Sequence, residues 1–223
     1  MEEVKIIFED KYLLVVEKPA GMTTTKEKKE EKGTLEDILR ETEPNDLPRN
    51  GIVHRLDKGT SGMVLMAKDE LVWKNLKSQF KQRKIIKKYI CLVSGDTSVD
   101  GVINMPIGRS KYSFGKFGVR VDGKESLTEF RTINKYRKDD KIFSLLQINL
   151  KTGRTHQIRV HMNYLKWPLV GDRLYGGDIN LIKRPFLHAE FIQFKHPKSG
   201  KVISFKSDLP NDLNLVLKQY EKI

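Results

Sequence analysis

Cysteine occurs only once in this 223-residue chain, at position 91. One thiol cannot form an internal disulfide or a zinc site built from several cysteines, so we expect a reducing compartment, the cytoplasm. The chain also lacks any run of the roughly 18–20 uncharged apolar residues that a membrane-spanning helix needs. Its first residues alternate acids, bases and hydrophobes, without the apolar core or cleavage site of a secretory signal. We therefore expect no association with a membrane.

Signatures of cofactors are missing as well. No glycine-rich dinucleotide loop follows a predicted strand, and no P-loop occurs. The five histidines form no metal-ligand set, because His54 with Asp57, and His156 with His161, lack a third ligand at a usual spacing. We expect neither a cofactor nor a metal ion.

Basic residues are in excess, and the excess is uneven. The net charge is +13; residues 1–50 hold 9 Lys and Arg against 13 Asp and Glu, and the remainder carries +17. Such an excess is typical of proteins that neutralise nucleic-acid phosphates and release counterions. A lysine-rich surface that serves solubility or thermal stability would show the same excess. The charge therefore indicates a class of partner and no reaction.

Hydrophobic patterning predicts more strands than helices. Strands are predicted at 4–10, 12–19, 62–68, 85–93, 127–133 and 141–150. Helices are predicted at 34–42, 69–83, 156–165 and 212–220, with Thr34 and Thr155 as the N-caps of the first and third. Strands and helices do not alternate as in βαβ units, so we expect an α+β fold with a mixed, largely antiparallel central sheet flanked by helices. We further expect one domain over residues 1–223, with a mobile loop at 24–33.

The stretch HRLDKGTSG at residues 54–62 leads directly into a predicted strand. Glycines at 59 and 62 permit a tight turn that would project Asp57 from the edge of the sheet. A carboxylate placed there can act as a nucleophile or general base if a cation keeps it ionised. Asp57 could equally cap the turn through the backbone amides of Thr60 or Ser61. Residue chemistry leaves both interpretations open.

A second polar stretch, LKTGRTHQIRVHMNYLKWPLVGDRLYGG, covers residues 150–177. Lys151, Arg154, Arg159 and His161 gather around a turn and a helix start, which is a ready anion site. On the helix, Arg159 lies away from the apolar face and could extend into a cleft to pair bidentately with a carboxylate. A surface salt bridge, worth about 0–1 kcal/mol, is the alternative for Arg159.

Several motifs occur in an order that resembles a known family. HRLDKGTSG, KKY, RTHQIRVH, PLVGDRLYG and LHA resemble the RluA family of pseudouridine synthases, which modify large ribosomal RNA and transfer RNA. The resemblance runs from KPAG at 18–21 to HP at 196–197, and its most specific elements are HRLDxxTSG and RTHQIRxH. It implies the pseudouridine synthase fold and the isomerisation of uridine.

The resemblance also implies roles for individual residues. Asp57 would be the essential nucleophile, and Arg159 would form a salt bridge with it that keeps it ionised. Tyr89 would stack on the target uracil, although on its strand it could instead be a core aromatic. The further residues implied to bind substrate are Arg55, which would fill the gap that the base leaves, Leu187, which would form an apolar wall, His54, Thr60 and Arg154.

Two features depart from the family pattern. After KPAG, family members commonly have a short apolar run and a His, whereas here GMTTTKEKK follows. The first strand begins near residue 4, so we expect no N-terminal RNA-binding domain of the S4 type. RNA affinity would then come from the basic helix 69–84 and from the loop 108–120, where Tyr112, Phe114 and Phe117 interleave with Lys and Arg. A flexible hairpin with incidental aromatics is the alternative for that loop.

We expect the chain to act as a monomer on uridines of ribosomal or transfer RNA, after the target base has left its stack. A catalytically inactive RNA-binding or assembly factor on the same fold is a second hypothesis. A nucleic-acid glycosidase is a third, and it needs a second acid near Asp57, for which Asp172 is the candidate.

Overall fold

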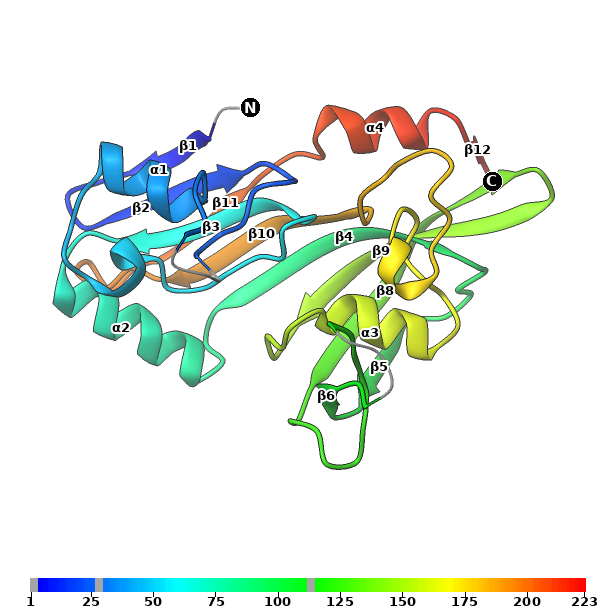
Figure 1. Cartoon of the computed structure of the whole chain (residues 1–223), viewed down its shortest axis with the longest axis horizontal. Coiled ribbons are helices and arrows are strands. Elements are labelled where there is room, and N and C mark those ends of the chain that lie inside the picture. Colours follow the sequence, from blue (N-terminus) through cyan, green and yellow to red (C-terminus); the bar gives the residue numbers. More distant parts are fainter. Residues whose placement is uncertain (1–3, 27–29, 112–114) are drawn as a thin grey trace. The chain divides into compact units, whose positions relative to one another are not determined.

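The computed structural model describes residues 4–26, 30–111 and 115–223, and the chain forms two compact units (Figure 1). The first unit consists of Met1–Ile86 and Ala189–Ser207, and the second of Lys87–His188 and Asp208–Ile223. Both units are discontinuous, because the main chain leaves the first at the start of strand β4 (Ile86–Ser94) and returns within strand β10 (Leu187–Lys195). That residues 1–223 act as one domain stays a prediction.

The strands of the first unit follow the order β1, β2, β3, β10, β11, and the pairs β1–β2, β2–β3 and β10–β11 are antiparallel. Their pairing places Val15 opposite Leu65 in β2 and β3, and Ile192 opposite Phe205 in β10 and β11. The elements of this unit besides β10 are β1 (Lys5–Glu9), β2 (Leu13–Lys18), α1 (Leu35–Thr42), the 3-10 helix η1 (Pro48–Gly51), β3 (Ser61–Ala67), α2 (Glu70–Lys81) and β11 (Val202–Lys206).

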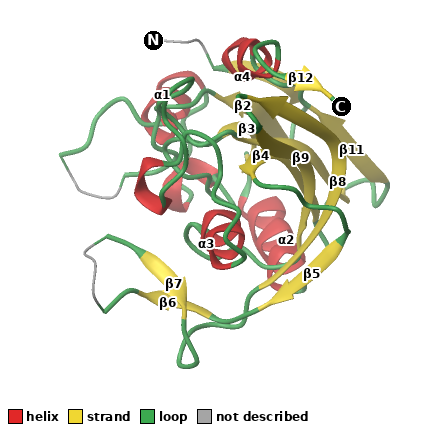
Figure 2. Cartoon of the chain, turned by 90° about the vertical axis from the view of Figure 1, so that its right-hand side faces the viewer, coloured by secondary structure: helices red, strands yellow, loops and turns green. Residues whose placement is uncertain are grey.

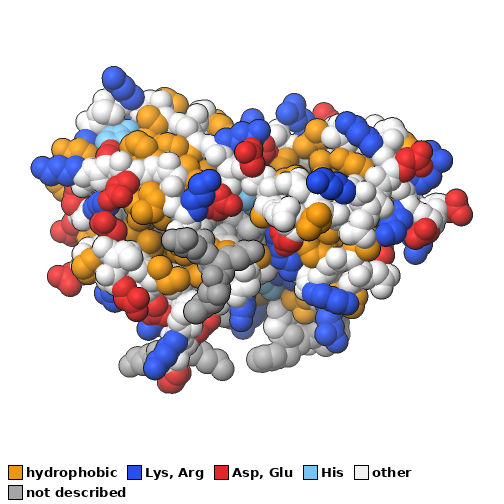
Figure 3. All heavy atoms as spheres, turned by 90° about the horizontal axis from the view of Figure 1, so that it is seen from above, with side chains coloured by type: hydrophobic (Ala, Val, Ile, Leu, Met, Phe, Trp, Pro, Cys, Tyr) orange, Lys and Arg blue, Asp and Glu red, His pale blue; other side chains and the backbone are white. Residues whose placement is uncertain are grey.

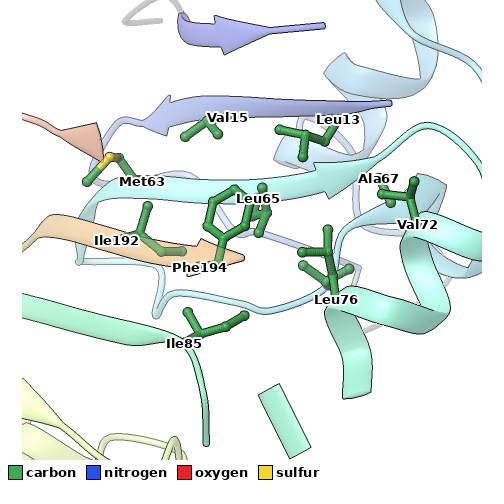
Figure 4. Close-up of a cluster of buried hydrophobic side chains, with 11 residues drawn as sticks. Leu13, Val15, Met63, Leu65, Ala67, Val72, Leu76, Ile85, Ile192 and Phe194 are labelled. Carbon is green, nitrogen blue, oxygen red and sulfur yellow. The ribbon is translucent and has the colours of Figure 1, made fainter. Parts of the chain in front are cut away.

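The core of the first unit lies between its strands and α2 (Figure 4). Alternate residues of the strands project to one face, and residues four apart on α2 meet them there. Asp69 caps α2, and its side chain accepts a hydrogen bond from Val72 N. The buried residues of this core include Leu13, Val15, Met63, Leu65, Ala67, Val72, Leu76, Ile85, Ile192 and Phe194.

Gly62 allows β3 and β10 to approach each other closely. Its φ is +120°, and a β-carbon at this position would lie 2.4 Å from Ala189 O. Any other residue here would combine backbone strain with a clash. Of the two glycines predicted to open the turn after Asp57, Gly62 is therefore the one with the left-handed φ.

The second unit contains antiparallel strands in the order β4, β9, β8, β12, and β5 also pairs with β8. Strands β6 and β7 form a separate two-stranded hairpin (Figure 2). The elements besides β4 are β5 (Gly101–Asn104), β6 (Ile107–Arg109), β7 (Phe117–Val119), β8 (Leu127–Lys138), β9 (Lys141–Leu150), α3 (Gln157–Tyr164), the 3-10 helix η2 (Arg173–Tyr175), α4 (Asn211–Leu217) and β12 (Glu221–Lys222).

A separate core fills the second unit between its strands and α4. Ile90 and Leu92 of β4 and Leu145 of β9 lie in one cluster with Leu213 and Val216 of α4. The α+β class and the largely antiparallel sheet are confirmed, since the pairs β1–β2, β2–β3, β10–β11, β4–β9 and β8–β9 are all antiparallel. Among the residues that the structure describes, no helix is long and apolar enough to cross a membrane.

Of the two predicted helix N-caps, one is confirmed and the other is wrong. Thr34 caps α1 with a full capping box, because its side chain accepts from Asp37 N and the Asp37 side chain accepts from Thr34 N. Thr155 is not the N-cap of α3. That position belongs to His156, which has a left-handed φ of 56° and makes no side-chain capping bond.

Two residues of the loop predicted at 24–33, Thr24 and Thr25, are buried. That this segment is mobile stays a prediction. Lys26 is exposed and pairs with Asp37 at 2.8 Å. Residues 27–29 lie outside the described part of the chain.

We predict that Leu65→Ala lowers the free energy of unfolding by about 2–5 kcal/mol, because it leaves a cavity among fully buried neighbours. Leu71→Ala on α2 is the matched control, since Leu71 is 69% exposed and its loss should change stability by less than about 0.5 kcal/mol. Urea denaturation of both variants measures the difference. Equal effects would contradict the placement of Leu65 in the core.

Candidate functional site

Asp57 lies in an irregular segment immediately before β3. Thr60 N donates a hydrogen bond of 3.0 Å to the main-chain oxygen of Asp57, which closes a tight turn at the start of the strand. Leu56 is buried, Asp57 is half-buried and Arg55 is exposed. The predicted turn at Asp57 is thus present, with its neighbours alternating between core and solvent.

His54 attaches the same segment to β3. Val53 N donates to Leu65 O at 3.1 Å, and His54 Nε2 accepts from Leu65 N at 3.1 Å. This bond assigns the ring proton of His54 to Nδ1. The ring also lies 4.9 Å from that of Phe80, centroid to centroid. His54 therefore has a structural position beside the loop, and its contact with substrate stays a prediction.

In the second unit, Arg159 is buried and bound by a carboxylate. Its Nε donates to Asp172 Oδ2 at 2.6 Å and its Nη2 to Asp172 Oδ1 at 2.8 Å. Arg159 is 8% exposed and Asp172 1%, so the alternative of a surface salt bridge is wrong. The bidentate carboxylate contact predicted for Arg159 exists with Asp172. Asp57 belongs to the first unit, and its pairing with Arg159 stays a prediction.

Tyr175 connects Arg159 with the β6–β7 hairpin. The Arg159 guanidinium carbon lies 5.0 Å from the centroid of the Tyr175 ring. The Tyr175 hydroxyl accepts from Phe117 N at 3.1 Å and shares a hydrogen bond of 3.0 Å with His156 Nδ1. Tyr175 was not predicted as a site residue, although its place three residues after Asp172, in GDRLY, was the available signal.

The anion site predicted around the start of α3 does not include His161. This residue is fully buried, with Nδ1 2.8 Å from Thr128 Oγ1 and Nε2 2.9 Å from Met105 O. Burial lowers the pKa of His161 below its usual 6.5, and a bond to Met105 partly offsets the effect. Arg154 Nε donates to the main-chain oxygen of Glu125, so it too is oriented by a neighbour of its own.

Tyr89 and Leu187 are buried residues of the second unit. Tyr89 lies on β4 opposite Ile148 of β9, and Leu187 begins β10. Lys87, two residues before Tyr89, is half-buried, and burial lowers its pKa to about 8. The substrate contacts of Tyr89 and Leu187 stay predictions.

The two basic surfaces predicted from the sequence lie on α2 and on the β6–β7 hairpin. Helix α2 and the turn after it expose Lys74, Lys77, Lys81, Arg83 and Lys84. On the face drawn in Figure 3, Lys and Arg side chains are interspersed with Asp and Glu. On the hairpin, Arg109 lies over the Phe117 ring at 5.8 Å, while Tyr112 and Phe114 lie outside the described residues. Within the described ranges, no three His, Cys, Asp or Glu side chains gather in a way that could hold a metal ion.

Comparison with known proteins gives a consistent result. Residues 12–164 match the family model described as RNA pseudouridylate synthase. The chain is 36% identical over 236 residues to ribosomal large subunit pseudouridine synthase D of Buchnera aphidicola subsp. Schizaphis graminum, covering 97% of this chain and 73% of the relative. It is 36% identical over 227 residues to an uncharacterized RNA pseudouridine synthase, YlyB, of Bacillus subtilis, covering 99% and 74%. The solved structure of human RNA Pseudouridylate Synthase Domain Containing 1 matches with a TM-score of 0.82 and 25% identity, covering 100% of this chain and 89% of that one.

We predict that Asp172→Asn lowers the free energy of unfolding by about 3–5 kcal/mol, because it removes the anion bound bidentately to a buried guanidinium. Asp212→Asn is the matched control. Asp212 also binds an arginine through both oxygens, Arg184, but its side chain is 48% exposed, so about 1 kcal/mol or less should be lost. Chemical denaturation compares the two, and equal losses would be inconsistent with the burial of the Arg159 pair.

We predict that His161 makes the protein less stable as the pH falls. Its pKa is lowered in the folded chain, so the unfolded chain takes up the proton first, and stability is lost from about pH 6.5 downwards. His161→Gln should show a shallower fall in melting temperature between pH 7 and 5. A wild-type and a variant profile with the same slope would refute the prediction.

Proposed function

Because the chain belongs to the RNA pseudouridylate synthase family, whose members are isomerases, we propose that it converts specific uridines of structured RNA into pseudouridine with Asp57 as the nucleophile. The observation that carries this proposal is the family match over residues 12–164, which includes Asp57, Tyr89 and Arg159. The half-buried carboxylate at the turn before β3 supports it, since a reacting group must be both held and accessible.

The reaction rearranges one nucleotide. The N1–C1′ bond breaks, the uracil rotates, and C5 bonds to the same C1′ while the proton of C5 leaves to solvent and N1 gains one. Asp57 would attack C1′ or C6, or assist the elimination of the base, and a carboxylate that forms a sugar adduct has precedent in glycosidases. In each case the carboxylate must be ionised, which is the role proposed for the Arg159 guanidinium.

The target base must leave its stack, at a cost of a few kcal/mol. In the proposal, Tyr89 stacks on the extruded uracil, Leu187 forms an apolar wall, and Arg55 fills the gap in the RNA. His54, Thr60 and Arg154 would bind the substrate, and the bonds of His54 to Leu65 and of Thr60 to Asp57 would also hold the Asp57 loop in place. These contacts favour uridines in loops and bulges, where unstacking costs least.

We propose large-subunit ribosomal RNA as the first substrate to test, because several relatives are named ribosomal large subunit pseudouridine synthases, and transfer RNA as the second. The charge of +17 over residues 51–223 supports an RNA partner. The exposed lysines of α2 and the β6–β7 hairpin would contact its phosphates and bases. We propose that the chain acts as a cytoplasmic monomer.

The glycosidase hypothesis needs Asp172 to donate a proton. Both oxygens of Asp172 accept from Arg159, and Oδ1 also accepts from Tyr175 N at 3.3 Å. An ionised carboxylate in this arrangement is an acceptor only. The bonds of Asp172 therefore favour isomerisation over hydrolysis. The inactive RNA-binding factor is the remaining alternative, and turnover distinguishes it.

We predict that Asp57→Asn folds and binds RNA with wild-type affinity but forms no pseudouridine, because the amide cannot act as a nucleophile. A mass-tag assay on a large-subunit RNA transcript measures turnover, and filter binding measures affinity. Asp46→Asn, at an exposed aspartate of the same unit, is the control and should keep full activity. Normal turnover by Asp57→Asn would show that the nucleophile is another group.

A further inference from the structure

The segment that follows β2 forms a turn closed by a buried lysine. Lys18 is 0% exposed, and its Nζ donates to Pro19 O at 2.8 Å and to Met22 O at 2.7 Å. Gly21, at the tip, has a φ of +85°. A buried ammonium that holds two main-chain oxygens makes this turn a rigid feature of the first unit.

Gly21 and Thr24, in the segment after β2, form hydrogen bonds with the main chain on both sides of Asp57. Gly21 N donates to Lys58 O at 2.8 Å. The Thr24 hydroxyl donates to Leu56 O at 2.8 Å and accepts from Leu56 N at 3.0 Å. A hydroxyl has one donor and two acceptor positions, so this one group satisfies both polar groups of the Leu56 backbone. Residues 56 and 58 are thus fixed, and Asp57 lies between them.

The main chain at Thr24 is in turn held by helix α1. Glu36 N, in the first turn of α1, donates to Thr24 O at 3.0 Å, and Leu35 N donates to Thr23 O at 2.9 Å. These are two of the amides that a helix leaves without an internal partner. Thr24 is only 1% exposed, so water does not compete for the hydrogen bonds of its hydroxyl. Helix α1 therefore anchors Thr24, and Thr24 anchors Leu56.

We propose that Thr24 is a positioning residue for pseudouridine formation, which fixes the backbone of Leu56 so that the Asp57 carboxylate is presented in one orientation. The proposal rests on the proposed function of Asp57. It gives a role to the stretch GMTTT, which departs from the apolar run common in the family. Without the hydroxyl, the buried N–H and C=O of Leu56 would lose their partner, and the loop would shift to find others. A displacement of about 1 Å at a reacting group costs on the order of a hundredfold in rate.

The test compares three variants as full chains on the same RNA transcript. Thr24→Val keeps the shape and removes the hydroxyl, and we expect kcat to fall by about 10–100-fold while the RNA dissociation constant stays within about twofold. Thr24→Ser keeps the hydroxyl and should restore kcat to within about threefold of wild type. Thr97→Val is the matched control, since it removes another buried hydroxyl, one bonded to Thr132 in the second unit, and should leave kcat unchanged.

Wild-type kcat in folded Thr24→Val overturns the proposal. So does an equal loss of kcat in Thr97→Val, which would mark the effect as general destabilisation. Asp57→Asn distinguishes failure of the proposed nucleophile from failure of the positioning role. Activity in that variant overturns the roles of both Asp57 and Thr24. An inactive Asp57→Asn together with a normal Thr24→Val overturns the role of Thr24 alone. Amide hydrogen exchange of the wild-type chain needs no variant. The proposal requires slow exchange at Leu56 N, and exchange at the rate of an open loop contradicts it.

Discussion

A guanidinium buried in the second unit organises much of what surrounds it. A charge in this position is costly unless a hydrogen-bonded partner neutralises it, and Asp172 does so through both of its oxygens. Asp172 also caps η2, which brings Tyr175 onto the guanidinium. The Tyr175 hydroxyl then holds Phe117 of the hairpin. The side chain proposed to keep the nucleophile ionised and the hairpin proposed to contact RNA therefore depend on the same pair.

In the first unit, hydrogen bonds to the main chain hold the loop that carries Asp57. If Asp57 is the nucleophile, as proposed, it must remain accessible, so it cannot be fixed by burial of its own side chain. Its neighbours are fixed instead: Val53 and His54 attach to β3, Leu56 is held by Thr24, and the Lys58 oxygen accepts from Gly21. Hydrogen bonds to the main chain thus preorganise the loop that carries Asp57.

Local signals made part of this predictable from the sequence. The cap of α1, the long strands and the turn at Asp57 follow from residues within a few positions of one another. Strands β10 and β11 were missed, although they form a local hairpin in which Lys195 pairs with Val202. The partner of Arg159 lies 13 residues away and that of Thr24 lies 32 away, so neither follows from helical or strand periodicity. His161, an apparent surface cation, is buried for the same reason: its acceptor, Met105, is 56 residues away.

The central claim is that the chain joins C5 of a uracil to the sugar from which it was detached. Incubation of the full chain with a large-subunit RNA transcript that carries tritium at C5 of uridine tests this most directly. We expect one tritium released to water for each pseudouridine formed, with no free uracil. Release of free uracil in place of pseudouridine would contradict this claim. RNA that binds the chain but keeps all of its tritium would contradict it too.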